Sequence, residues 1–206
     1  EVVLYDRDKE DREAIANGIA GKRGATLVRP YDDPFVIAGQ GTVGREIAED
    51  MTALGLTPDI VVPPASGGGL IAGVATAVKA KFPQAQIIVA EPKDYDDHGL
   101  SLRAGHREAH HAAGRTICDA LMAAMPGEMT FSINSKLLAN GVIASDEEVG
   151  AAVAYAYREL KLVVEPGGAV GLAALLAGRI DAKGKNVVIV LSGGNVDADL
   201  FAKLVA

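Results

Sequence analysis

A run of three glycines between two apolar segments constrains the fold of this chain more than any other feature. Residues 60–64 read Ile-Val-Val-Pro-Pro, residues 66–69 read Ser-Gly-Gly-Gly, and residues 70–78 are almost entirely apolar. This pattern predicts a strand, a tight turn and the start of a helix, because glycine adopts backbone conformations closed to other residues. The N–H groups of such a turn converge on a space that the positive end of the helix dipole also faces. That geometry favours a bound phosphate, and a turn without any ligand is the alternative.

The rest of the chain alternates between strand-like and helix-like segments. Apolar runs predict strands at residues 2–5, 25–28, 59–63, 86–90 and 186–191, the last of them fully buried. Helices are predicted at residues 9–22, 35–54, 69–81, 116–124, 134–140, 146–160, 167–177 and 197–205. The helix at residues 146–160 has Ser145 as its N-cap and Glu148 in the capping-box position. Such alternation predicts an α/β fold with a mainly parallel open sheet and helices on both faces. Ligands of such sheets bind at the carboxyl ends of the strands, so residues 64–69, 91–92 and 192–195 are candidate walls of a site.

Charge and cysteine content argue against several classes of protein. The 206 residues carry a net charge of −7, which argues against broad binding to nucleic acid or to an acidic membrane surface. Cys118 is the single cysteine, so no internal disulfide forms, and a reducing, cytoplasmic setting is expected. No apolar run reaches the length of a membrane span. The chain opens on Glu1 without a methionine, and we expect further sequence upstream.

Four segments resemble one enzyme family in their order and spacing. They are residues 33–42 (Asp-Pro-Phe-Val-Ile-Ala-Gly-Gln-Gly-Thr), 66–70 (Ser-Gly-Gly-Gly-Leu), 164–169 (Val-Glu-Pro-Gly-Gly-Ala) and 191–197 (Leu-Ser-Gly-Gly-Asn-Val-Asp). Together they resemble the serine/threonine dehydratases and serine racemases, which are fold-type II pyridoxal-phosphate (PLP) enzymes. The family carries its Schiff-base lysine in a Ser-Phe-Lys-x-Arg-Gly segment that these 206 residues lack. The resemblance implies that residues 1–33 end the small cofactor domain and that residues 34–206 form the large PLP-binding domain.

The resemblance also implies a set of cofactor-binding residues. The backbone of Ser66, Gly67, Gly68, Gly69 and Leu70 would hold the PLP phosphate, with Ser66 standing where the family usually has a fourth glycine. Ser192 matches the partner of the pyridine nitrogen, and Glu165 matches a position near the cofactor ring. Two simpler alternatives are that Ser192 caps the helix after it and that Glu165 only caps the helix near residue 168.

Substrate residues and the reaction follow from the same resemblance. Arg12 matches an arginine near the substrate carboxylate, Asp119 and Ala120 match a pair that lines the substrate pocket, and Asn195 matches a nucleotide-effector position in some racemases. An exposed helix arginine with neighbouring partners is the alternative for Arg12. The implied activity is that of an ammonia-lyase (dehydratase), which converts threonine, serine or 3-hydroxyaspartate to a 2-oxo acid and ammonia. Racemisation and an inactive PLP-binding or phosphate-binding fragment are the alternatives, and a homodimer is expected.

An acidic segment after the strand at residues 86–90 is a candidate metal site. Glu91, the backbone carbonyl of Tyr95 and Asp97 offer oxygen ligands that suit a hard cation, and the family binds Mg²⁺ or Ca²⁺ here. A solvated acidic loop is the alternative. The chain has four histidines, at His98, His106, His110 and His111. The last three have a spacing that resembles a metal-binding helix, but their charged surroundings favour a solvated loop.

Overall fold

The computed structural model describes residues 1–6, 9–111 and 114–206, and it divides into two compact units, Glu1–Pro30 and Tyr31–Ala206. The first unit contains helix α1 (Arg12–Arg23), which begins where the Asp11 carboxylate accepts the N–H groups of Glu13 and Ala14. The strands predicted at residues 2–5 and 25–28 are wrong, since neither segment is extended in a sheet. A short apolar run forms a strand only when a neighbouring strand satisfies its backbone hydrogen bonds.

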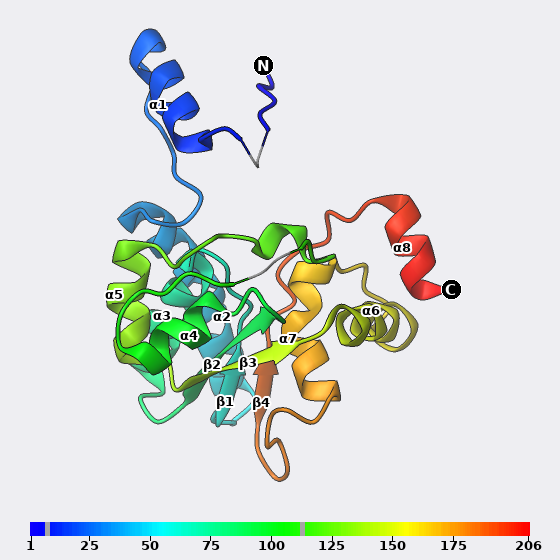
Figure 1. Ribbon diagram of the computed structural model, residues 1–206. Coiled ribbons are helices and arrows are strands. Elements are labelled where there is room, and N and C mark those ends of the chain that lie inside the picture. Colours follow the sequence, from blue (N-terminus) through cyan, green and yellow to red (C-terminus); the bar gives the residue numbers. More distant parts are fainter. Residues whose placement is uncertain (7–8, 112–113) are drawn as a thin grey trace. The chain divides into compact units, whose positions relative to one another are not determined.

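The second unit is built on a four-stranded parallel sheet in the order β3-β2-β1-β4 (Figure 1). Its strands are β1 (Ile60–Val62), β2 (Gln86–Pro92), β3 (Asn140–Ala144) and β4 (Val187–Ile189). All three strand pairs are parallel, which confirms the predicted sheet. Strand β3 was not predicted, because Asn140 and Gly141 interrupt its apolar pattern. Strand β4 is half-buried rather than fully buried, because it forms an edge of the described sheet.

Helices cover both faces of this sheet. Their bounds are α2 (Pro34–Ala53), α3 (Gly69–Lys81), α4 (Asp97–Ala104), α5 (Glu128–Leu137), α6 (Asp146–Tyr155), α7 (Pro166–Leu176) and α8 (Ala198–Val205). A single 3₁₀ turn, η1 (Asp119–Leu121), replaces the helix predicted at residues 116–124, and a π-helical turn, η2 (Ala156–Leu160), extends α6. The predicted bounds of α3 are confirmed. Helix α5 begins before the predicted residue 134, because Gly127 precedes its first turn.

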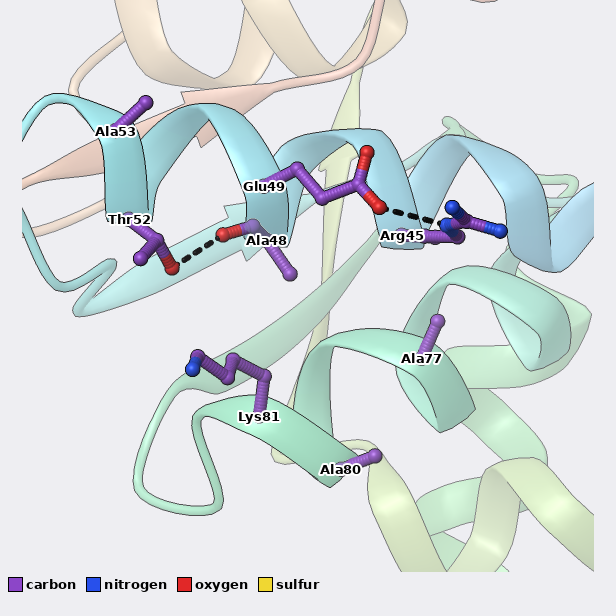
Figure 2. A pocket seen from close by; sticks show the side chains of 8 residues that line it. All are labelled: Arg45, Ala48, Glu49, Thr52, Ala53, Ala77, Ala80 and Lys81. Carbon is purple, nitrogen blue, oxygen red and sulfur yellow. Dashed lines mark hydrogen bonds and ion pairs between the residues drawn. The ribbon is translucent and has the colours of Figure 1, made fainter.

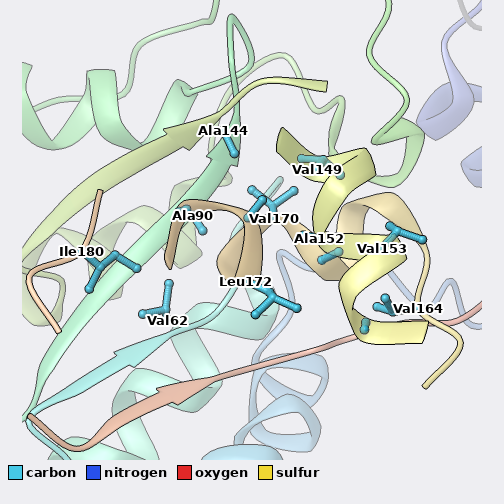
Figure 3. Close-up of a cluster of buried hydrophobic side chains, with 14 of the residues drawn as sticks. Val62, Ala90, Ala144, Val149, Ala152, Val153, Val164, Val170, Leu172 and Ile180 are labelled. Carbon is cyan, nitrogen blue, oxygen red and sulfur yellow. The ribbon is translucent and has the colours of Figure 1, made fainter. Parts of the chain in front are cut away.

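Alternate residues of the strands divide the core into two layers. Ile60, Val62, Ile88 and Ala90 pack against α6 and α7, as Figure 3 shows for Val62 and Ala90. Their neighbours Val61, Ile87 and Val89 pack against α3 on the opposite face. Successive strand side chains point to opposite faces, so continuous apolar strands indicate a sheet covered on both sides.

Helix α2 continues through the glycine-rich stretch at residues 39–41 and packs closely on α3. A Cβ on Gly73 would clash with the backbone of Ile37 and Gly41, and a Cβ on Gly44 would lie 2.6 Å from the carbonyl oxygen of Val74. These glycines therefore let the two helix backbones approach each other. The structure also confirms the predicted capping box on α6, in which Ser145 and Glu148 bond to each other's backbone N–H groups.

Candidate active site

The glycine turn follows β1 and leads directly into α3. Gly68 is the N-cap of α3 and has a φ of 97°, which glycine adopts without strain. Gly67, Gly68 and Gly69 are buried, and Ser66 and Leu70 are half-buried. No hydrogen bond joins the N–H groups of residues 66–70 to another described residue. These N–H groups are therefore left for a ligand at the positive end of the α3 dipole.

The oxygens of this turn are held by the segment that leads into α5. The Thr130 hydroxyl donates to the carbonyl of Gly67 at 2.7 Å, and the Gly127 N–H donates to the same oxygen at 3.1 Å. The Asn134 amide donates to the carbonyl of Gly68 at 3.3 Å. The Ser66 hydroxyl accepts the N–H of Ala123 at 3.0 Å. The turn is thus fixed with its carbonyls against the protein, which leaves the N–H groups to define an anion cradle.

A second aspartate, Asp32, precedes the N-cap residue of α2 and holds the start of α5, the helix that binds the glycine turn. Asp33 caps α2, whereas the Asp32 carboxylate accepts the N–H groups of Glu128 at 3.2 Å and Thr130 at 3.0 Å. Asp32 thereby satisfies two free N–H groups at the start of α5. The sequence analysis missed Asp32, Thr130 and Asn134. The signal available in the sequence was the pair Asp32 and Asp33. A helix needs only one N-cap residue, so the other aspartate was free to bind elsewhere.

The segment after β4 meets the start of α7. The Glu165 carboxylate accepts the N–H of Asn195 at 3.1 Å, and the Glu165 N–H donates to the carbonyl of Gly193 at 3.0 Å. Glu165 is the N-cap residue of α7, but its side chain makes no cap hydrogen bond with that helix. Ser192 is exposed, and the N-cap of α8 is Asp197, so the alternative that Ser192 caps this helix is wrong. Strands β1 and β4 are parallel neighbours, so Ser192 and the glycine turn leave the same edge of the sheet.

The other predicted substrate residues occupy different places. Asp119 and Ala120 are the first two residues of η1 and are exposed, and a Cβ on Gly167 would lie 3.5 Å from the Ala120 Cβ. The turn η1 therefore packs beside the start of α7. Ala123, which contacts Ser66, follows η1 by a few residues in the chain. Arg12 is the exposed first residue of α1 in the first unit, and its substrate role stays a prediction.

Glu91 and Asp97 lie in a buried cluster at the end of β2, which rules out the solvated acidic loop. The Glu91 carboxylate accepts the N–H groups of His98 and Gly99, both at 2.8 Å, at the start of α4. Glu91 and His98 are 0% exposed and Asp97 is 1% exposed. Burial, followed by the charge of Asp97, raises the pKa of Glu91 well above its ordinary value, and burial raises the pKa of Asp97. Tyr95, which precedes Asp97 by two residues, is also buried.

The histidines divide into one buried residue and a loop. His106, His110 and His111 lie in a loop rather than on a helix, with His106 and His111 exposed and His110 half-buried against the Tyr95 ring at 4.5 Å. The predicted solvated loop is therefore confirmed only for its exposed members. His98 is fully buried, a placement that the sequence analysis missed because its neighbours in sequence are polar.

We predict that Cys118 stays unreactive in the native protein. The residue is 0% exposed, and burial raises the pKa of its thiol to about 12. At pH 8 the reactive thiolate is then only roughly one part in ten thousand of the thiol. A thiol-reactive chromogen should label no cysteine before denaturant is added and one per chain afterwards. Rapid labelling of the native protein at pH 8 would contradict this placement.

A cavity of about 720 Å³ between α2 and α3 lies outside the residues described above (Figure 2). Its walls include Ala48, Ala53 and Ala77, and its charged residues include Arg45 and Glu49, which already pair with each other at 2.7 Å. Lys81 also lines this cavity, but no residue at the carboxyl end of a strand does. The glycine turn and the strand ends beside it, rather than this cavity, therefore form the candidate active site.

Comparison with known proteins identifies the family. A model of the family described as pyridoxal-phosphate dependent enzymes matches residues 1–193. The chain belongs to this family. The free N–H groups at the start of α3 fit the phosphate of that cofactor. Residues 67–69 of this turn must be glycines, because a Cβ at each of them would overlap with a neighbouring residue. No described helix is long and apolar enough to cross a membrane.

Individual relatives of this PLP-family chain carry several activities. The chain is 37% identical to an L-threonine ammonia-lyase of Thermotoga maritima, and the match covers 100% of the chain and 50% of that protein. It is 36% identical to an L-threo-3-hydroxyaspartate ammonia-lyase of Saccharomyces cerevisiae, over 100% of the chain and 61% of that protein. The structure of maize serine racemase matches 98% of this chain with a TM-score of 0.87 and 35% identity, and the match covers 61% of the racemase chain. The chain thus spans about half to three fifths of the length of these relatives.

Proposed function

We propose that the protein to which this chain belongs is a PLP-dependent ammonia-lyase for a small β-hydroxy amino acid. Threonine, serine and 3-hydroxyaspartate are the candidate substrates, and the products are a 2-oxo acid and ammonia. The observation that carries the proposal is the glycine turn, whose carbonyls are held by α5 and whose N–H groups remain for a phosphate. The names of the relatives support the reaction class.

The residues of this chain would bind and orient the cofactor. The N–H groups of residues 66–70 would hold the phosphate, and Ser192 after β4 and Glu165 at the N-cap of α7 would approach the ring. When bound, PLP supplies an electron sink for the negative charge that develops on the substrate α-carbon. The Ser192 hydroxyl is a weak acid and would leave the pyridine nitrogen without a full proton. A weaker sink favours prompt departure of the β-hydroxyl over a long-lived charge at the α-carbon.

Substrate contacts and assembly complete the proposal. We assign substrate binding to Arg12, Asp119 and Ala120, and we place the lysine that moves the α-proton outside these 206 residues. Residues 1–33 would belong to the small cofactor domain, and residues 34–206 would form the large domain. The enzyme would act in the cytoplasm, as the single cysteine suggests, and as a homodimer, as the resemblance implies.

A divalent cation is the second proposed ligand. Glu91, Asp97 and the carbonyl of Tyr95 would hold it, and Mg²⁺ or Ca²⁺ are the ions that oxygen ligands alone select. Two buried carboxylates in one cluster support this assignment, because buried charges need a partner of opposite sign.

The proposed reaction is tested on the purified protein loaded with PLP. Each candidate substrate is incubated with it, and 2-oxo acid, ammonia and the D-enantiomer are measured. The protein is also reduced with borohydride, and its intact mass is compared with the 21.2 kDa of this chain. We expect a 2-oxo acid from at least one substrate and a PLP adduct on a species heavier than 21.2 kDa.

Two outcomes support the alternatives. Formation of the D-enantiomer with little 2-oxo acid indicates a racemase, the activity after which two solved relatives are named. A 21.2 kDa species that binds PLP without forming an adduct indicates an inactive PLP-binding fragment.

A further inference from the structure

The orientation of the peptide between Gly67 and Gly68 decides whether the glycine turn can bind an anion. Gly68 has a φ of 97° and a ψ of 2°, close to the values of the third residue of a type II β-turn. A half-turn of the preceding peptide converts such a turn to type I, and glycine allows both forms. Because the C=O and N–H of a trans peptide point in opposite directions, this half-turn would replace the Gly68 N–H on the ligand side with the Gly67 carbonyl.

Two donors at the start of α5 hold this peptide in the observed form. The Thr130 hydroxyl donates to the Gly67 carbonyl at 2.7 Å, and the Gly127 N–H donates to it at 3.1 Å. Thr130 is 0% exposed and Gly127 is buried, so bulk water does not replace either bond. After a half-turn of the peptide, the Gly127 N–H would face the Gly68 N–H and lose its acceptor, which is unfavourable for a buried donor.

Tyr31 and Asp32 hold the two sides of this contact in place. The Asp32 carboxylate accepts the Thr130 N–H at 3.0 Å, and a Cβ on Gly127 would overlap with that carboxylate. Asp32 therefore packs directly against both donors. A Cβ on Gly67 would overlap with three atoms of the Tyr31 ring, so the Gly67 Cα lies against this ring. The acceptor and its donors are thus fixed by two adjacent residues of the chain.

We propose that Thr130 is a positioning residue for the cofactor phosphate and makes the site select phosphorylated ligands, because it holds the Gly68 N–H toward them. The inference rests on the PLP site of the proposed function and adds a residue that controls its selectivity. Thr130 acts through the Gly67–Gly68 peptide rather than by touching the ligand. The next peptide depends less on α5, since the Gly68 carbonyl accepts the N–H of Ala72 within α3 at 3.0 Å as well as the Asn134 amide at 3.3 Å.

The test compares PLP with pyridoxal, which lacks the phosphate, on the purified protein freed of cofactor. Absorbance titration gives the affinity for each ligand, and the ratio of the two affinities reports the contribution of the phosphate. Thr130→Val is the diagnostic variant, because valine keeps the shape of threonine without the hydroxyl, and Thr130→Ser restores the hydroxyl. Thr76→Val is the matched control, since the Thr76 hydroxyl also donates to a backbone carbonyl at 2.7 Å, that of Ala72 within α3.

We expect Thr130→Val to lower the affinity for PLP by about tenfold or more and to leave the affinity for pyridoxal within about twofold of wild type. The ratio of the two affinities then falls by a similar factor, whereas Thr130→Ser and Thr76→Val should keep the wild-type ratio. An equal loss of affinity for both ligands, or an unchanged ratio, in folded Thr130→Val would overturn the inference.

Further results separate this inference from the proposed function. If wild type binds PLP no more tightly than pyridoxal, the glycine turn does not hold the phosphate and both fail. A lower ratio in Thr130→Val, with no 2-oxo acid formed by wild type, would leave the inference standing without the proposed reaction. If Thr130→Val does not fold, Asp32→Asn replaces it, because asparagine offers one carbonyl oxygen to the two N–H groups of Glu128 and Thr130. A lower ratio in Asp32→Asn supports the inference, and the wild-type ratio overturns it.

Discussion

Gly68→Ala is expected to lower the affinity for PLP by on the order of 100-fold and the free energy of unfolding by about 2–4 kcal/mol. The φ of Gly68 is 97°, where an alanine is strained. The new Cβ would also lie 2.6 Å from Nε2 of His98 and 2.9 Å from Nδ2 of Asn134. The turn must move away from both side chains, and its N–H groups then no longer converge. Absorbance titration with PLP and urea unfolding measure the two effects.

Gly178→Ala is the matched control for this prediction. Gly178 follows α7 with a φ of 71°, and a Cβ there would meet nothing within 4 Å. This variant incurs the backbone strain of about 1–2 kcal/mol without a steric clash, and its PLP affinity should equal that of wild type. Wild-type PLP affinity in Gly68→Ala would show that the turn does not hold the cofactor.

Glu91→Ala should destabilise the protein by about 2–5 kcal/mol, even in the presence of a chelator. The substitution leaves the N–H groups of His98 and Gly99 without their acceptor at a fully buried position. It also leaves a cavity at the start of α4. Urea unfolding in chelator measures this effect apart from any loss of metal binding. Glu91→Gln should cost less, because the amide oxygen still accepts one of the two N–H groups.

Glu46→Ala serves as the control for an exposed glutamate. Its free energy of unfolding should stay within about 0.5 kcal/mol of wild type. An equally small effect of Glu91→Ala would contradict the buried hydrogen bonds at the start of α4 and remove the structural basis of the cation site.

Strong local patterns made much of the fold predictable. Residues 69–81 form the predicted helix, and the Ser145–Glu148 capping box starts α6 as expected. Predictions failed where a segment depends on distant partners. Residues 2–5 have a strand pattern without a sheet, whereas β3 has a weak pattern but pairs with five residues of β2. Strand formation needs a neighbour, so the local sequence alone does not decide it.

The candidate site shows the same division. The glycines of the turn and the acidic pair Glu91 and Asp97 were identified from the sequence. The residues that orient them were not, since Asp32, Thr130 and Asn134 are ordinary polar residues in sequence. His98 was named among the four histidines but was given no role, although it is fully buried beside the acidic pair.

The sequence alone determined the parallel α/β class, the strand–turn–helix unit and the family resemblance, because each depends on short local patterns and on their order along the chain. Only the tertiary structure decided which way the turn's carbonyls point and which polar groups are buried. Thr130 lies 63 positions from the Gly67 it binds, and Asp32 lies 98 positions from Thr130. Contacts over such separations form only when the sheet brings the segments together, and they leave no periodic signal in the sequence.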